Sequence, residues 1–219
     1  MLWERRSFDS QRISNPEHAQ AYLAKPFDSA PQRRRGGAVV VHHRRRRILD
    51  LGTGDGRLLA LLHAHCPDAA LIGVDFSVTM LDAAGRFAGD ERVSILEHDL
   101  NYPLPAIGPL DAVVSSFAIH HCPDERKRSL YAEIYDLLTP GGVFCNLEHV
   151  ASPTPALHAR FLDELGADEA DEDRSNILLD VFTQLDWLRA IGFDDVDCYW
   201  KWLELALFGG VCASPGIGH

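Results

Sequence analysis

The sequence Ile-Leu-Asp-Leu-Gly-Thr-Gly-Asp-Gly at residues 48–56 decides the fold, because an apolar strand pattern runs there through three glycines into a helical pattern at 57–65. Glycine accepts positive φ and lets a ligand touch the backbone, and the first turn of a helix offers free N–H groups to an anion or a carboxylate. This order is typical of a ligand-binding loop in a parallel α/β protein. A glycine turn that binds nothing is the alternative interpretation.

The residues around the loop indicate which ligand it fits. A dinucleotide fingerprint, Gly-x-Gly-x-x-Gly, needs glycine where this sequence has Arg57. Asp50 would repel a pyrophosphate but attract an amine, and Asp75 ends the next apolar run, where a carboxylate accepts hydrogen bonds from ribose hydroxyls. A strand-end cap is the alternative for Asp75. Phe76 and Met80 follow at helical spacing and would hold an adenine, or else pack in the core. An aminoacyl, sulfonium-bearing ligand therefore suits the loop better than a dinucleotide.

The rest of the chain alternates short apolar runs with helical patterns, as repeated β-α-β units do. Strands are expected at residues 47–51, 71–75, 93–97, 111–115 and 143–148, with helices at 57–65, 77–88 and 124–138 and a Thr-Pro-Gly-Gly turn at 139–142. Later residues predict helices at 154–166 and 183–191, then two strands, 195–202 and 205–213, that pair antiparallel at a sheet edge. A short helix capped by Asn15 is expected at 15–23.

Four motifs together resemble those of the class I S-adenosylmethionine-dependent methyltransferases: residues 50–56, 73–77 (Gly-Val-Asp-Phe-Ser), 98–100 (His-Asp-Leu) and 138–142 (Leu-Thr-Pro-Gly-Gly). The resemblance covers about residues 46–213. It implies an α/β, Rossmann-like fold with a seven-stranded sheet in the order 3-2-1-4-5-7-6, the last strand antiparallel, and helices on both faces. Residues 46–219 would form this domain and 1–45 an N-terminal helical or lid segment. The stretch 36–47 departs from the family, since it lacks a clear amphipathic helix before the first strand.

The resemblance also implies a cofactor and its contacts. The cofactor would be S-adenosyl-L-methionine, with S-adenosyl-L-homocysteine as its product. The residues that would meet the methionine part are Asp50, Gly52, Gly54, Gly56 and Ser115. Asp75 would bind the ribose, and Asp99 with Leu100 the edge of the adenine. A looser resemblance to carboxy-S-adenosylmethionine synthases, which transform the cofactor itself, stands beside this one.

Histidines mark the expected substrate side. Ligands of open α/β sheets bind beyond the carboxyl ends of the strands, which singles out His120 after the fourth strand and Glu148 with His149 after the fifth. Such a group is typical of a general base, and the orienting of loops is its structural alternative. We expect no metal, because methyl transfer from a sulfonium needs no Lewis acid.

Aromatic and acidic residues near the C-terminus have two interpretations each. Strand alternation puts Trp200 and Trp202 on one face and Tyr199 on the other. They would pack in the core or form an aromatic wall for the acceptor. The acidic stretch 163–173 would be a solvated surface or a selector of basic substrates.

Composition limits the partners of the chain. A net charge of -11 disfavours nucleic acid, and the arginine cluster at residues 33–47 is expected to be a solvated surface. No apolar run approaches the roughly 18 residues of a membrane helix, and the first ten residues do not have the pattern of a signal peptide. The five cysteines contain no Cys-x-x-Cys, so neither a disulfide framework nor a zinc site is indicated. These features predict a cytoplasmic protein. They do not determine its oligomeric state, for which a homodimer is one alternative.

The function expected from the sequence is methyl transfer to a small-molecule acceptor. A role in tRNA modification, or another use of the cofactor without methylation, is the second hypothesis. A third is a non-catalytic binding protein that kept the cofactor loop.

Overall fold

The computed structural model describes residues 46–214. The segment 1–45, the helix expected at 15–23 and the arginine cluster apart from Arg46 and Arg47 lie outside the described residues.

Seven strands form one sheet in the order β3-β2-β1-β4-β5-β7-β6. Their bounds are β1 Arg47–Leu51, β2 Ala70–Asp75, β3 Val93–Glu97, β4 Leu110–Ser116, β5 Leu138–His149, β6 Phe193–Trp202 and β7 Leu205–Cys212. Strand β7 runs antiparallel to both β5 and β6, whereas the pairs from β3 to β5 are parallel. The expected order, the antiparallel last strand and the closing hairpin are therefore confirmed.

The helices follow the predicted positions with one exception. They are α3 Arg57–His65, α4 Val78–Ala83, α5 Asp124–Leu137, α6 Pro155–Leu165 and α7 Val181–Ile191, with 3₁₀ turns η2 Ala84–Phe87, η3 Ile119–His121 and η4 Glu169–Asp171. The single helix expected at 77–88 is wrong, because α4 ends at Ala83 and the chain continues as η2. Gly85 lies in that turn, and glycine destabilises a helix interior by about 1 kcal/mol relative to alanine.

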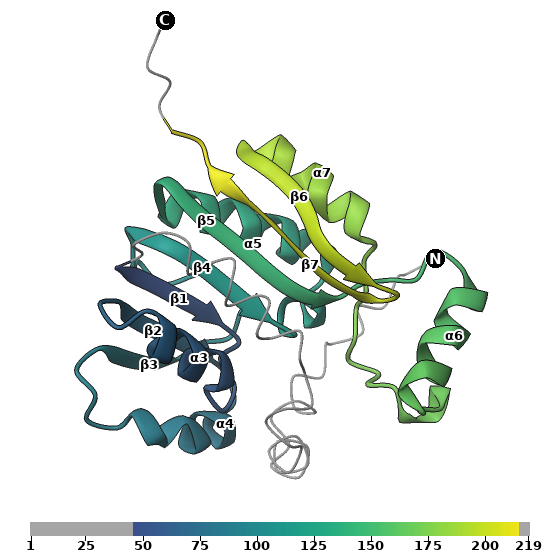
Figure 1. Cartoon of the computed structure of the whole chain (residues 1–219), viewed down its shortest axis with the longest axis horizontal. Coiled ribbons are helices and arrows are strands. Elements are labelled where there is room, and N and C mark those ends of the chain that lie inside the picture. Colours follow the sequence, from purple (N-terminus) through teal and green to yellow (C-terminus); the bar gives the residue numbers. More distant parts are fainter. Residues whose placement is uncertain (1–45, 215–219) are drawn as a thin grey trace, which may run out of the picture.

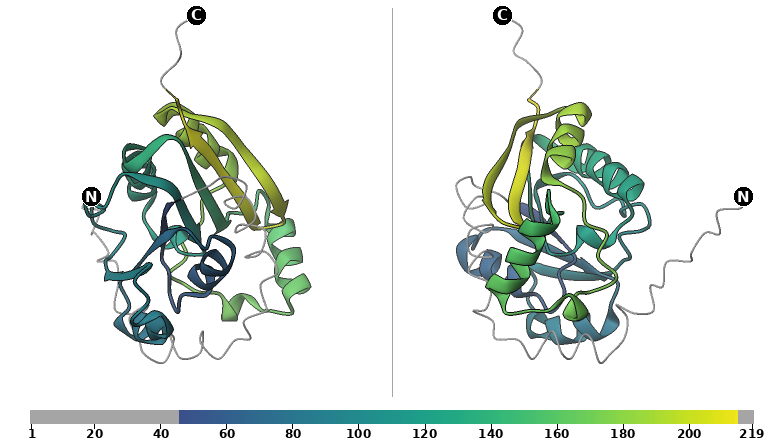
Figure 2. Two further views of the ribbon diagram at one scale, coloured as in Figure 1. Left: turned by 60° about the vertical axis from the view of Figure 1, so that its left-hand side comes forward. Right: turned by 90° about the vertical axis from the view of Figure 1, so that its right-hand side faces the viewer.

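The sheet lies between two layers of helices, and its side chains alternate between them. In β1, Leu49 and Leu51 join the larger core cluster with α5 and α7, while Ile48 joins the smaller cluster with α3. Figures 1 and 2 show α5 and α7 on one face of the sheet and α3 on the other. Because β1 pairs parallel with both β2 and β4, the carboxyl ends of these three strands lie at one edge of the sheet.

Strand β5 begins earlier than predicted. Leu110 of β4 pairs with Leu138, and Ala112 pairs with Val143, so the residues between them form an irregularity in the ladder. Gly141 lies there at a φ of 75°. The expected turn at 139–142 is thus incorporated into the irregular start of the strand instead of separating α5 from it.

Helix α6 lies outside the layers, beyond the ends of β5 and β6 (Figure 1). Its N-cap is Thr154, whose side chain accepts a hydrogen bond from the backbone of Leu157 at 3.3 Å, and it ends at Gly166 with a φ of 64°. The helix therefore stands at the side of the sheet where a substrate is expected.

Candidate functional site

The loop between β1 and α3 has the backbone conformation that its glycines permit. Gly52, Gly54 and Gly56 have φ values of 68°, 55° and 78°. A Cβ on Gly52 would lie 2.1 Å from the Cβ of Ala118, so this loop contacts the segment that follows β4. A Cβ on Gly56 would lie 2.8 Å from Phe87, which means that this glycine allows α3 to pack closely.

Asp50 lies at the base of this loop and is 1 % exposed. Its carboxylate accepts a hydrogen bond from the Thr53 hydroxyl at 2.8 Å, and the Thr53 backbone N–H donates to Val74 of β2 at 2.9 Å. These bonds hold the loop across the ends of β1 and β2.

Asp75 ends β2 and binds the same loop from the other side. Its two oxygens accept backbone N–H bonds from Gly54 and Ser77, each at 2.9 Å. Burial nevertheless raises the pKa of Asp75 above its ordinary value, although backbone donors at Ser77, Gly54 and Phe76 act to lower it. A carboxylate whose pKa is raised by burial is stabilised in its charged form by additional hydrogen-bond donors. The hydroxyl groups of a ribose are such donors.

The residues predicted around the adenine lie near Asp75. A Cβ on Gly54 would lie 3.1 Å from the methyl carbon of Met80, so this side chain reaches the loop. One oxygen of Asp99 accepts both the backbone and side-chain N–H of Asn101 at 2.9 Å. The side chain of Leu100 packs in the larger core cluster, so a contact with a ligand would involve its backbone.

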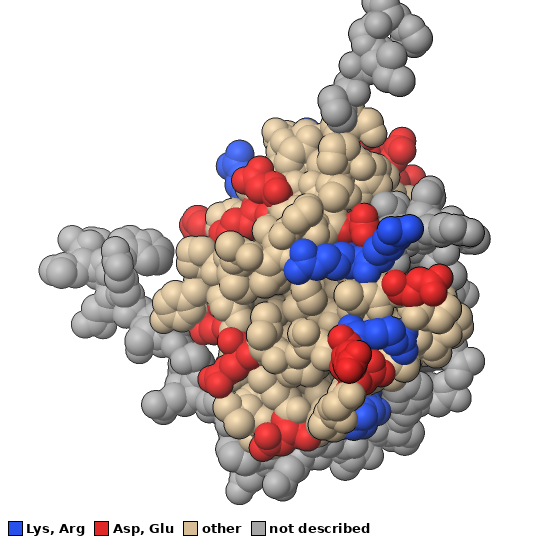
Figure 3. Space-filling view, turned by 90° about the vertical axis from the view of Figure 1, so that its left-hand side faces the viewer, with Lys and Arg blue, Asp and Glu red and all other residues tan. Residues whose placement is uncertain are grey.

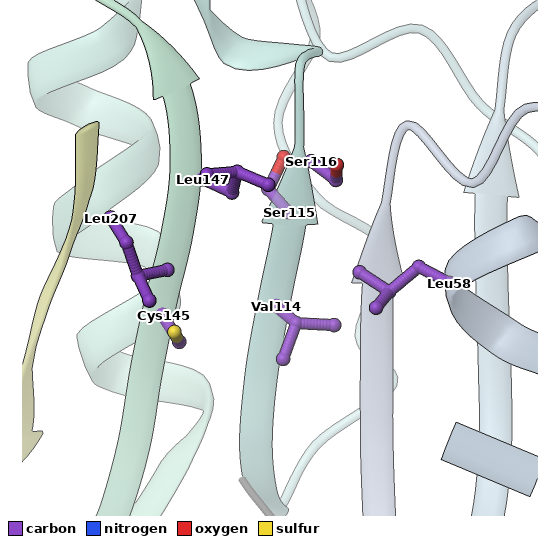
Figure 4. A pocket seen from close by; sticks show the side chains of 7 residues that line it. All are labelled: Leu58, Val114, Ser115, Ser116, Cys145, Leu147 and Leu207. Atoms are coloured by element: carbon purple, nitrogen blue, oxygen red, sulfur yellow. The ribbon is translucent and has the colours of Figure 1, made fainter. Parts of the chain in front are cut away.

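Ser115 joins β4 to β1, because its hydroxyl donates to the Leu51 carbonyl at 2.9 Å. It also lines a small, mainly apolar pocket between the ends of β4 and β5, the start of β7 and the start of α3. Figure 4 shows the lining residues, which are Leu58, Val114, Ser115, Ser116, Cys145, Leu147 and Leu207.

His120 and Glu148 form a buried pair at the ends of β4 and β5. They are 6 % and 1 % exposed, and the Nδ1–H of His120 donates to the carboxylate of Glu148. The backbone N–H of His149 donates to the same oxygen at 3.0 Å, and Asn146 Nδ2 donates to the other at 3.4 Å. Burial acts to raise the pKa of Glu148, but the charge and hydrogen bond of His120 outweigh it and the pKa is lowered.

His149 lies next to this pair. Its ring centroid is 6.0 Å from that of His120 and 5.3 Å from that of Phe161 in α6. Its Nε2–H donates to Glu204 at 2.8 Å, and burial lowers its pKa. The structure thus brings together all three residues predicted on the substrate side, and it adds Glu204, which no motif in the sequence singled out.

His121 and Lys127 join the segment before α7 to this site. Ser175 contacts Nδ1 of His121 at 3.1 Å, and burial lowers the pKa of His121 to about 4, with His120 adding to the effect. The Ile177 backbone N–H donates to the His120 carbonyl at 3.0 Å, and the buried Lys127 ammonium donates to the Ile177 carbonyl. Sequence patterns did not indicate these contacts, because they join positions about 50 residues apart.

The aromatic residues of β6 have different surroundings. Cys198 pairs with Phe208 and Trp200 with Leu207, so Tyr199 is an extra residue in the ladder. Trp200 packs against the smaller core cluster, while Trp202 meets Phe161 edge to face at 6.0 Å and remains partly exposed. Phe161, Trp202 and His149 therefore form one aromatic group beside the His120–Glu148 pair.

Three wider features of the described region bear on its partners. Within residues 46–214, no three His, Cys, Asp or Glu side chains are grouped so that they could hold a metal ion. No helix in the same part of the chain is long and apolar enough to cross a membrane. On the face shown in Figure 3, basic side chains lie next to acidic ones.

Sequence comparisons identify a matching family and several curated relatives. Residues 48–142 match the family described as "Methyltransferase domain". A demethylmenaquinone methyltransferase of Thermus thermophilus is 39% identical over 113 residues, which cover 50% of each chain. A carboxy-S-adenosyl-L-methionine synthase of Chromohalobacter salexigens is 34% identical over 112 residues, covering 48% of this chain and 41% of that one. The chain thus matches about half the length, or less, of these curated relatives.

Solved structures extend the likeness to the whole fold. An O-methyltransferase family protein from Burkholderia thailandensis superposes with a TM-score of 0.71 at 21% identity, over 94% of this chain and 63% of that one. Human N-acetylserotonin methyltransferase in complex with S-adenosylmethionine gives a TM-score of 0.65 at 17% identity, over 91% and 56% of the two chains. At these identities the likeness is one of fold.

Proposed function

Since this chain belongs to the class I S-adenosylmethionine-dependent methyltransferases, whose cofactor is S-adenosylmethionine, we propose that it methylates a small aromatic acceptor with an ionisable hydroxyl group. The observation that carries this proposal is the buried His120–Glu148 pair. His120 lies on the segment that follows β4, and Ala118 of the same segment lies against Gly52 of the glycine loop. This arrangement would put a proton acceptor close to the expected methyl group.

The residues of the loop fit the donor groups of the cofactor. Asp50, Asp75 and Asp99 follow one another at or just beyond the ends of β1, β2 and β3. An amino group, two ribose hydroxyls and the adenine amine would supply hydrogen bonds to these carboxylates in the same order. Gly52 and Gly54 would leave room for the methionine part, and Phe76 with Met80 would flank the adenine.

The acceptor would lie between the cofactor loop and the aromatic group of Phe161, Trp202 and His149. Bound S-adenosylmethionine would supply a methyl group on a positively charged sulfur, so that a nucleophile bonds to the methyl carbon in line while the sulfur leaves as the thioether of S-adenosylhomocysteine. His120 donates Nδ1–H to Glu148 and in its neutral form therefore has a lone pair at Nε2. That nitrogen would take the hydroxyl proton of the acceptor, while the charge of Glu148 stabilises the imidazolium.

The nature of the acceptor follows from this chemistry and from the relatives. A phenol-type hydroxyl becomes a strong oxygen or ring-carbon nucleophile once it loses its proton. The demethylmenaquinone methyltransferase relative supports a ring of the quinol type. The main contribution of the protein would be positioning, which in well-oriented reactions reaches effective molarities on the order of 10⁵ M or more.

Two measurements test the proposal. Calorimetry should give binding of S-adenosylmethionine and S-adenosylhomocysteine that is tighter than binding of NAD. Release of S-adenosylhomocysteine should then be followed with reduced naphthoquinones, catechols and simple phenols as acceptors. Tighter NAD binding, or cofactor binding without turnover of any hydroxylated ring, would count against the proposal.

The carboxy-S-adenosyl-L-methionine synthase relative supports a second candidate, an enzyme that carboxylates the cofactor instead of transferring its methyl group. Mass spectrometry of the reacted cofactor separates the two. A carboxylated sulfonium without S-adenosylhomocysteine would favour this second function.

A further inference from the structure

Glu204 is an unusual residue for its place in the fold. It lies in the tight connection between β6 and β7, after Leu203 with a φ of 49°, and its side chain is 0 % exposed. A buried carboxylate costs several kcal/mol of desolvation unless it is paired, and an apolar residue in such a position often stabilises a protein equally well. The contacts of Glu204 therefore need an explanation other than stability.

Each oxygen of the Glu204 carboxylate is bound to one histidine. Oε2 accepts from Nε2–H of His149, and Oε1 accepts from Nδ1–H of His158 in α6, both at 2.8 Å. The backbone carbonyl of Glu204 accepts from the N–H of Val150 at 2.7 Å, so the connection is also bound to the end of β5. Glu204 is the point where β5, α6 and the β6–β7 hairpin meet.

The bond to His149 determines the protonation of its ring. An ionised carboxylate only accepts hydrogen bonds, so the proton of the neutral imidazole is on Nε2 and the lone pair is on Nδ1. Burial acts to raise the pKa of Glu204, but hydrogen bonds from Ser152, His149 and His158 outweigh it, so its pKa is lowered and the carboxylate is ionised.

The bond to His158 holds α6. His158 lies in the first half of this helix, and Phe161, almost one turn later, packs on both His149 and Trp202. The Nε2 of His158 is 3.4 Å from Glu172, beyond the end of the helix. The hydrogen bond that His158 donates to Glu204 raises the pKa of His158, which favours an ion pair between the two.

We propose that Glu204 is a positioning residue, whose carboxylate keeps His149 in the Nε2–H form and holds α6 so that Phe161 closes the acceptor side of the site. This inference rests on the proposed function. The inference adds to the proposed function a residue that touches neither cofactor nor acceptor but acts through His149 and His158.

Glu204→Gln is the variant that tests the proposal, because it keeps the size of the side chain. The two histidines bind different oxygens of Glu204. A glutamine in the same position presents its one oxygen to one histidine and its N–H₂ group to the other. Either His149 changes tautomer or His158 loses its Nδ1 proton. Glu172→Gln is the matched control, since it removes the outer and more exposed partner of the same histidine.

The first readout needs no substrate. Ring ¹⁵N chemical shifts should give a single Nε2–H tautomer for His149 in the wild-type protein and in Glu172→Gln, and a changed protonation of His149 or His158 in Glu204→Gln. Unchanged shifts at both histidines in a folded Glu204→Gln protein would overturn the proposal.

The second readout separates positioning from cofactor binding. With an acceptor in hand, Glu204→Gln should lower kcat/KM for the acceptor by about 10²-fold, the effect typical of a small misplacement, while the Kd for S-adenosylmethionine stays within about twofold. An equal loss in Glu172→Gln would refute a specific role. A wild-type protein that methylates nothing would contradict the proposed function, and the ¹⁵N shifts would still decide the role of Glu204.

Discussion

Glu148→Gln is the most informative change at the proposed proton acceptor. It removes the charge that faces His120 but keeps an oxygen that accepts from His120 and from the His149 backbone. The new N–H₂ group would face Asn146, whose Oδ1 is buried without a hydrogen-bond partner within the described residues. Rotation of the Asn146 amide would give the new donor an acceptor, so the variant is expected to fold.

The expected effect follows from the lost charge. Two unit charges about 4 Å apart attract by about 4 kcal/mol at an effective dielectric constant near 20, and each 1.36 kcal/mol is worth about a factor of ten in rate. Turnover that depends on a protonated His120 should therefore fall by about 10³-fold. The loss of a charge-assisted hydrogen bond should cost about 1–2 kcal/mol of stability, or roughly 2–8 °C in Tm for a chain of this size.

The assay is release of S-adenosylhomocysteine at saturating cofactor, with calorimetric cofactor affinity and thermal unfolding measured on the same samples. Glu133→Gln is the control, because Glu133 is a partly buried carboxylate paired with Arg126 on α5. Near wild-type turnover in a folded Glu148→Gln protein would refute proton transfer to His120. A parallel loss of cofactor affinity would assign Glu148 to cofactor binding instead.

Three further predictions concern the cofactor loop and pH. Asp75→Asn should weaken S-adenosylmethionine binding about 10- to 100-fold in calorimetry, as expected for charge-assisted hydrogen bonds. In the control variant Asp82→Asn, which changes an exposed carboxylate, the affinity for the cofactor should change little. Equal effects of the two substitutions would contradict a ribose contact. Gly52→Ala should lower both cofactor affinity and Tm, because its Cβ would lie 2.1 Å from Ala118, and adding Ala118→Gly should restore part of the Tm; an unchanged Gly52→Ala protein would argue against this close approach. His121 has a folded pKa of about 4 instead of its ordinary 6.5, so the native state binds fewer protons than the unfolded state between these values. This difference in pKa contributes at most about 3 kcal/mol to the free energy of unfolding. The contribution is complete above pH 6.5 and is lost as the pH falls toward 4. Denaturant titrations at several pH values should therefore show a smaller loss of stability in His121→Asn than in the wild type, and an identical pH profile would refute this.

Local patterns in the sequence determined most of the fold. Strands β1 and β3 and helix α3 have the bounds that the apolar runs and the helical period predict, and α7 begins two residues before its predicted start. These signals act within a few residues. The errors occur where local signals competed. Gly85 divided the helix expected after Asp75, and residues 139–142 lie within the bounds of β5, where they form an irregularity in its pairing with β4.

The sequence also predicted the proposed cofactor loop and, on the substrate side, the pairing of His120 with Glu148. Asp50, Gly52 and Asp75 could be found because a strand, a glycine turn and a strand-end carboxylate form one short pattern. His120 and Glu148 could be expected together because β4 and β5 are neighbours in this order of strands, so their carboxyl ends meet.

Only the tertiary structure decided how the rest of the site is held. Glu204 meets His149 and His158 across 55 and 46 positions of the chain, and Lys127 meets Ile177 across 50. These contacts depend on the register of the β6–β7 hairpin and on where α6 lies, and both follow from packing over the whole sheet. A buried carboxylate between two imidazoles has no local sequence pattern, because the groups that pair with it come from other elements of the fold.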